Sequence, residues 1–196
     1  MTKIEALKQL KRECVDCRRC EIGGQHLNGC ITNVLSNMCL RARIMVVGQN
    51  PGEQEVAQGR PFVGPSGVFF DRAIRDVLGI DRKSLYITNT VHCYTPGNRT
   101  PTAVEVANCR DFLDREVAVV KPRLLVALGS PALDGLTNLS GIMRRCGRIC
   151  QSIRYALPVL PLLHPSPLNM NKADRRKMFY DGLESMRPYL NGMNDG

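Results

Sequence analysis

The chain has 196 residues, of which 43% are hydrophobic and 23% are charged. This is enough apolar material for one hydrophobic core and too short a chain for two ordinary domains, so we expect a single domain over residues 1–196. No run of about 18 uncharged apolar residues occurs, and the first segment, MTKIEALKQLKRE, mixes charged with apolar residues. These features disfavour a membrane span or a secretory signal and predict a cytoplasmic protein.

Charge and cysteine content narrow the choice of partner and cofactor. The 27 basic and 18 acidic residues give a net charge of +9, which suits a polyanion but also occurs in proteins that bind no nucleic acid. The nine cysteines are an odd number in a sequence of intracellular type. We therefore expect ligated or buried thiols rather than a disulfide scaffold.

Strands and helices alternate along the predicted chain. Buried strands are expected at 43–48, 85–91, 124–129 and 157–163, the last demoted towards an edge or a shorter strand by Pro158 and Pro161. Helical patterns cover 4–12, 66–78, 102–119 and 172–190, and Thr102 with Glu105 forms a capping-box pattern. The gaps between strands are long enough for parallel crossovers. The pattern predicts an α/β fold, namely a three-layer α/β/α sandwich around a small, central, parallel four-stranded sheet.

In such a sheet, ligands bind beyond the carboxyl ends of the strands. The residues there are Gln49 and Asn50 after the first strand, His92, Cys93 and the segment 96–99 after the second, Gly129 and Ser130 after the third, and His164 to Ser166 after the fourth. We expect the chemistry of the protein to lie among them.

The cysteines offer a possible metal site. Cys14, Cys17 and Cys20 form a C-x2-C-x2-C pattern, and Cys93 and Cys109 follow far downstream. Four thiolates from two separated segments suit tetrahedral zinc or a cubane iron-sulfur cluster, and the spacing does not choose between them. Buried, unligated thiols are the simpler interpretation for four other cysteines, namely Cys146, Cys150, Cys30 and Cys39.

The loop from Gly48 to Gly52, followed by the segment 59–64, has the residues of ordinary turns. It matches a dinucleotide-binding loop poorly, because Pro51 interrupts it and no G-x-G-x-x-G leads into a helix. An Asn at a strand end can orient a water or bind an amide edge, and Phe62, which we expect to be exposed, can stack on a flat ring. Together they favour a nucleobase pocket.

The strings GQNPGEQEVAQGRPFVGPSG, YITNTVHCYTPGNRTPTAVEVANC and LLHPSP, in that order, resemble the uracil-DNA glycosylase superfamily, and specifically its iron-sulfur (family 4) members. The resemblance covers about Cys17 to Ser166. It implies a three-layer fold, a 4Fe-4S cluster held by four cysteines, DNA as the partner, and base excision repair by hydrolysis of the N-glycosidic bond of a flipped-out uracil. We expect a monofunctional, monomeric enzyme.

The resemblance also implies roles for individual residues. Phe62 would stack on uracil, and Asn89 would read its Watson-Crick edge and so reject cytosine. His164 would stabilise the charge on the departing base, and Ser166 would contact a flanking phosphate. The cluster ligands would be Cys17, Cys20, Cys93 and Cys109, with Cys14 as the alternative to Cys20.

The first motif departs from the family pattern. Family 4 usually has Glu and a small residue where this chain has Gln49 and Asn50. Asn50 is a weak base, but a dissociative transition state needs mainly a positioned water and a stabilised anion. Gln49 would belong to the substrate-binding set, and the altered motif could admit other deaminated bases. The segment 23–41 is also longer than the family pattern, and the chain lacks the basic insertion of the branch that links covalently to DNA.

Two other functions compete with the glycosylase. A non-catalytic nucleic-acid-binding module, stapled by zinc or an iron-sulfur cluster, explains the charge and the cysteines. It leaves Asn50, Phe62, Asn89 and His164 without a purpose. An iron-sulfur electron carrier explains the cysteines alone.

Overall fold

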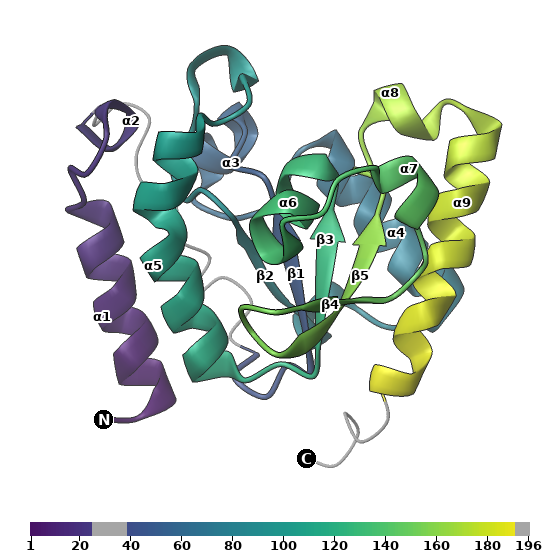
Figure 1. Ribbon diagram of the computed structural model, residues 1–196, viewed down its shortest axis with the longest axis horizontal. Coiled ribbons are helices and arrows are strands. Elements are labelled where there is room, and N and C mark those ends of the chain that lie inside the picture. Colours follow the sequence, from purple (N-terminus) through teal and green to yellow (C-terminus); the bar gives the residue numbers. More distant parts are fainter. Residues whose placement is uncertain (25–38, 191–196) are drawn as a thin grey trace.

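The computed structural model describes residues 1–24 and 39–190, which form an α/β sandwich (Figure 1). Its sheet has the strand order β2-β1-β3-β5-β4. The strands are β1 (Ile44–Gly48), β2 (Tyr86–Asn89), β3 (Leu124–Leu128), β4 (Cys150–Ser152) and β5 (Leu157–Leu162). The first three and β5 run parallel, whereas β4 pairs antiparallel with β5. The predicted four parallel strands are confirmed, and β4 adds a fifth that the sequence did not predict.

The predicted edge position of the strand that contains Pro158 and Pro161 is wrong. The strand with two prolines, β5, is six residues long and lies inside the sheet between β3 and β4. The carbonyl oxygen of Pro161 accepts a hydrogen bond from Gly147 N at 2.9 Å. Pro161 therefore faces the side of β4, at a position beyond the last residue pair between β4 and β5, which is Cys150 with Val159. Since N–H positions alternate along a strand, Pro158 faces β3, whose ladder with β5 begins only at Val159. Both prolines therefore stand where the ladder requires no N–H donor.

Helices cover both faces of the sheet, as predicted. The four helices that correspond to the predicted ones are α1 (Lys3–Val15), α4 (Pro65–Leu78), α5 (Ala103–Val120) and α9 (Ala173–Leu183). The 3-10 helix η4 (Glu184–Tyr189) continues α9. Shorter elements complete the fold: α2 (Glu21–Gly24), α3 (Glu53–Gln58), η2 (Arg82–Ser84), η3 (Pro96–Asn98), α6 (Ser130–Thr137), α7 (Ile142–Arg145) and α8 (Pro167–Met170). No helix among the described residues is both long and apolar enough to span a bilayer.

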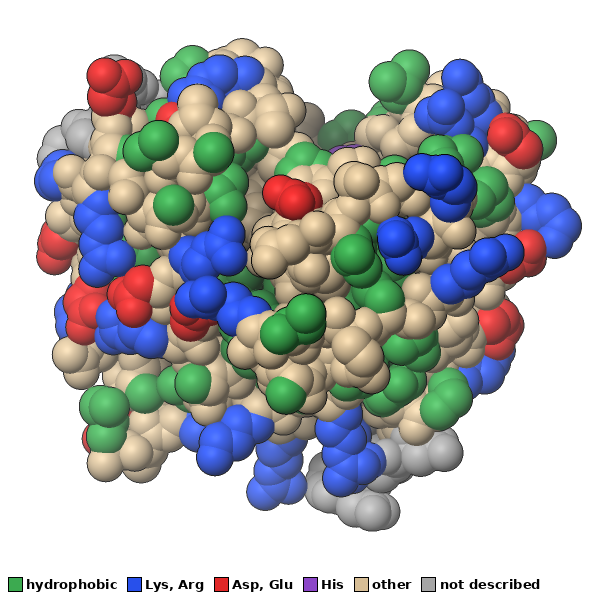
Figure 2. All heavy atoms as spheres, in the orientation of Figure 1, with side chains coloured by type: hydrophobic (Ala, Val, Ile, Leu, Met, Phe, Trp, Pro, Cys, Tyr) green, Lys and Arg blue, Asp and Glu red, His purple; other side chains and the backbone are tan. Residues whose placement is uncertain are grey.

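Two apolar cores lie on opposite faces of the sheet. One joins α1, α5 and α6 to residues such as Met45 and Val47 of β1, and the other joins α4, α9 and η4 to Ile44 and Val46 of the same strand. Alternate residues of β1 thus face opposite layers, and all five of its residues are buried. The carboxyl ends of the four parallel strands meet at one edge, which is hollowed between two raised rims (Figure 2).

Candidate functional site

A pocket of about 280 Å³ opens at this edge. It brings together five of the six residues predicted to catalyse or to bind substrate, namely Gln49, Asn50, Phe62, Asn89 and His164. Gln49 and Asn50 directly follow β1, Asn89 ends β2, and His164 comes two residues after β5. The strand-end rule therefore located the pocket correctly.

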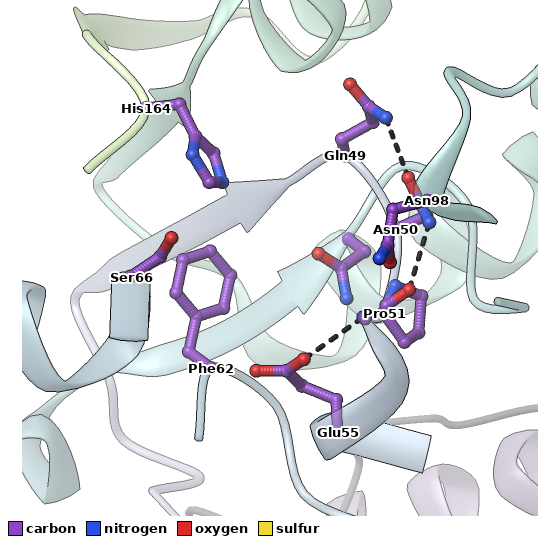
Figure 3. Close-up of a pocket in the computed structure, with 10 residues that line it drawn as sticks. Gln49, Asn50, Pro51, Glu55, Phe62, Ser66, Asn98 and His164 are labelled. Carbon is purple, nitrogen blue, oxygen red and sulfur yellow. Dashed lines mark hydrogen bonds between the residues drawn. The ribbon is translucent and has the colours of Figure 1, made fainter. Parts of the chain in front are cut away.

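The other expected residue lies elsewhere. Ser166 is half-buried at the residue before α8 and does not line this pocket. Conversely, the pocket contains Glu55 and Ser66, to which the sequence analysis gave no role, and Asn98 from the strand-end segment 96–99 (Figure 3). Ser66 and Glu55 sit on helices that follow the glycine-rich segments, so only a three-dimensional arrangement could have identified them.

Phe62 is buried, with 8% of its surface exposed, which corrects the expectation of an exposed ring. Its ring centroid lies 6.3 Å from that of Phe70 and 6.4 Å from that of His164. Because the ring forms a wall of the pocket, it can still present a face to a planar ligand.

The side chains of Asn89 and Phe62 both lie close to Gly48. A Cβ added to Gly48 would lie 2.5 Å from Asn89 Oδ1 and 2.8 Å from Phe62 Cε2, so a larger residue there would push both side chains out of place. Asn89 is 3% exposed, and within the described residues its amide has no hydrogen-bond partner. An unpartnered amide that lines a pocket is poised to bind a ligand's polar edge.

Three hydrogen bonds hold the side chain of Asn50 in place. Its amide nitrogen donates to Pro51 O and Thr95 Oγ1, both at 3.0 Å, and its oxygen accepts from Gln49 Nε2 at 2.8 Å (Figure 3). An amide has two donors and two acceptor lone pairs. What remains on Asn50 is one lone pair, which can accept a hydrogen bond from water.

His164 faces the pocket together with a carboxylate. Burial lowers the pKa of His164 below its usual value of 6.5, and the charge of Glu55 opposes that shift only partly. The imidazole is therefore neutral at pH 7 and offers one N–H donor. Glu55 itself accepts the N–H groups of Gly52, Val63 and Gly64 at 3.1, 2.8 and 2.9 Å.

The four predicted ligand cysteines come together in a second place. Cys17 and Cys20 follow α1, Cys93 follows β2, Cys109 lies in α5, and all four line one small hollow with Ile22, Val91 and Phe112. Burial raises the pKa of the Cys20 thiol, and the neighbouring Cys93, Cys109 and Cys17 raise it further. Cys14 is buried in α1 and does not line this hollow. Cys30 falls outside the described residues, and Cys39 is half-buried against the core.

His92 was expected at the strand-end site but points away from it. It is 1% exposed, with Nε2 3.2 Å from Glu116 Oε2 and Nδ1 3.4 Å from Cys109 Sγ. The same carboxylate accepts from Thr88 Oγ1 at 2.6 Å and from Tyr86 at 3.0 Å. His92 thus belongs to a buried polar network beneath the cysteines.

These features define an α/β protein with a pocket, walled in part by an aromatic ring, beyond its parallel strands. The chain matches the uracil DNA glycosylase superfamily over residues 35–186 and belongs to it. A Type-4 uracil-DNA glycosylase from Thermotoga maritima is 33% identical, over 96% of this chain and 97% of its own length. Relatives of the same name from Sulfurisphaera tokodaii and Archaeoglobus fulgidus are 30% and 32% identical, over 94% and 83% of this chain and 84% and 83% of their own lengths.

Proposed function

We propose that this protein is a monofunctional uracil-DNA glycosylase, which removes uracil from DNA by hydrolysing its N-glycosidic bond. The observation that carries the proposal is the pairing of Phe62 and Asn89 in one pocket. A ring wall suits stacking, and an unpartnered amide suits the polar edge of a pyrimidine. Membership of the superfamily and relatives named Type-4 uracil-DNA glycosylase support the same activity.

Base recognition is assigned to Asn89. A fixed amide can donate to a uracil carbonyl and accept from the ring N–H, whereas cytosine presents the reverse pattern at that edge. Gly48 allows the amide to lie beside the Phe62 ring, so a base stacked on the ring has its edge within reach of the amide. The pocket admits a base only after it has left the helical stack.

Bond cleavage is assigned to His164 and Asn50. As the bond breaks, negative charge grows on the departing base, and a neutral imidazole N–H in a water-poor pocket stabilises it. Positive charge grows on the sugar, and water attacks it. Asn50, with a single lone pair left, positions that water, while Gln49 fixes the rotamer of the Asn50 amide.

The hollow lined by cysteines is proposed to hold a 4Fe-4S cluster. Four thiols around one hollow suit a cubane cluster, in which each thiolate binds a different iron. A single tetrahedral zinc is the alternative that the same four thiols allow. When bound, the cluster would tie the segment after α1 to β2 and α5, as a structural staple.

DNA is the proposed partner, with Ser166 as a phosphate contact. Ser166 lies two residues after His164, at the N-cap of α8 and outside the pocket lining, and its hydroxyl can donate to a phosphate beside a flipped nucleotide. The Gln49 and Asn50 pair leaves open a broader range of deaminated bases. A panel of oligonucleotides with uracil, hypoxanthine or xanthine would define that range.

The test uses purified protein and a uracil-containing oligonucleotide, with alkali cleavage at abasic sites as the readout. We expect excision by the wild type and at least tenfold slower excision by Asn89→Asp, because a carboxylate cannot donate to the uracil carbonyl. Asn171→Asp, which makes the same change outside the pocket, is the matched control. Tight DNA binding without abasic sites would instead support the non-catalytic module.

A further inference from the structure

The backbone of Phe62 is in an unusual conformation. Its φ angle is 51°, in the left-handed region that bulky side chains rarely adopt. The carbonyl of Phe62 is also crowded, since a Cβ on Gly67 would lie 1.8 Å from its oxygen. The surrounding structure must hold this residue in place.

Arg82 holds the carbonyl side of the segment 61–64. Its guanidinium donates to Pro61 O at 2.7 Å and to Phe62 O at 2.8 Å, and it pairs with Asp71 Oδ2 at 3.1 Å. The side chains of Arg82 and Asp71 are only 22% and 26% exposed. A planar fork with several donors can bind two carbonyls and a carboxylate together.

Glu55 holds the amide side of the same segment. One of its carboxylate oxygens accepts from the N–H groups of Val63 and Gly64, while the other accepts from Gly52. Two charged side chains thus fix the polar groups of four consecutive residues, 61–64. Glu55 lines the pocket, but Arg82 lies in η2 and does not.

We propose that Arg82 is a positioning residue for base capture, which keeps the Phe62 ring directed into the pocket before DNA binds. The proposal rests on the proposed function, in which Phe62 stacks on the flipped base. A ring held in place in advance loses no further freedom when the base arrives, so capture is tighter. Arg82 acts on the base only through the backbone of residues 61 and 62.

The test compares Arg82→Gln with Arg75→Gln. Arg75 lies nearby in α4, has a 65% exposed side chain and does not contact the segment, so it controls for the loss of a positive charge. We expect faster amide hydrogen exchange over 62–64 in Arg82→Gln only. In single-turnover excision of uracil, the enzyme concentration for half-maximal rate should rise about tenfold, with the maximal rate within about twofold of wild type.

A double-mutant cycle with Phe62→Ala separates positioning from general damage to the fold. If Arg82 acts through the ring, Arg82→Gln should weaken capture no further in the Phe62→Ala background. Unchanged exchange over 62–64, or additive losses in the cycle, would overturn the proposal. Should Arg82→Gln fail to fold, Arg82→Lys, which keeps the charge without the fork, takes its place with the same criteria. A wild type that excises no uracil while the exchange result holds would refute the proposed function alone.

Discussion

At the scale of single residues, the proposed role of His164 rests on its charge state. Its lowered pKa makes it a neutral hydrogen-bond donor at pH 7, so we propose that it acts on the transition state and not by attracting the anionic backbone. We expect His164→Ala to slow single-turnover excision by about 100- to 1000-fold at saturating enzyme, the usual loss for one such donor. His164→Gln, which keeps an N–H donor, should lose less. Equal rates for His164→Ala and wild type would remove His164 from the chemical step.

The same lowered pKa has a consequence for stability. The unfolded chain binds a proton at His164 near pH 6.5, whereas the folded chain binds it only at lower pH. The stabilisation associated with the neutral imidazole is therefore complete above pH 6.5 and is lost as the pH falls below it. Urea unfolding of wild type and His164→Gln between pH 8 and pH 5 should show the variant losing less stability on acidification.

At the scale of elements, the capping box of α5 is reinforced by an ion pair. Glu105 accepts from both Arg99 Nη atoms at 2.8 and 2.6 Å and from Thr102 N at 2.7 Å, and the Arg99 bonds above all lower its pKa to about 2. Replacement by Gln should reduce the free energy of unfolding at pH 7 by about 1 to 3 kcal/mol, a range discounted because the Arg99 side chain is 43% exposed.

The pH dependence of that loss follows from the direction of the pKa shift. The unfolded pKa lies near 4.5 and the folded one near 2, so the stabilisation is present above pH 4.5 and disappears as pH falls towards 2. Denaturant unfolding of wild type and Glu105→Gln should therefore converge on acidification. Glu5→Gln in the capping box of α1, which has no arginine on its carboxylate, is the matched control and should cost less at pH 7.

The proposed cluster would connect three elements, and the choice of its ligands is testable. Cys20 lines the hollow with Cys17, Cys93 and Cys109, whereas Cys14 is enclosed in the core. Iron and sulfide analysis of protein purified without oxygen should find a depleted cluster in Cys20→Ala and a full one in Cys14→Ala. The opposite result would assign the ligand to Cys14.

The elements show where sequence reasoning succeeds and where it fails. The four short apolar runs predicted β1, β2, β3 and β5. Both β1 and β3 are apolar and buried throughout, as is typical of strands covered on both faces. The strand β2 is also buried throughout although Thr88 and Asn89 are polar, and the first two residues of β5 are half-buried. The strand β4 escaped prediction because it has three residues, mixed in polarity, and forms only by pairing with β5. The interior place of β5 depends on which neighbour each proline faces, and that requires the register.

Part of the pocket could be predicted from the sequence and part could not. Residues adjacent to strand ends, such as Asn89 and His164, follow from topology. Glu55 and Arg82 could not be found from the sequence because their partners are backbone atoms of a distant loop. The burial of Phe62 likewise depends on the fold of that loop rather than on its flanking glycines.

At the scale of the whole molecule, the surplus of positive charge should govern binding. Lysines and arginines are spread over the surface in Figure 2, and the net charge is +9. We expect the affinity for uracil-containing or abasic DNA to fall with salt, by about 0.9 log units per log unit of salt for each phosphate neutralised on duplex DNA and about 0.7 on single strands. Fluorescence anisotropy across a salt series measures this slope, and a flat line would exclude phosphate contacts.

Several polar side chains of the pocket come from separate places in the chain: residues 49–50 follow β1, Asn89 ends β2, and His164 follows β5. Each connection can accumulate substitutions while the strands beneath keep the others in position. Natural variation can therefore alter one contact with the base at a time, without first giving up the fold. We expect the Gln49 and Asn50 pair to influence which bases this chain accepts, so directed evolution aimed at new damaged bases should begin with that pair.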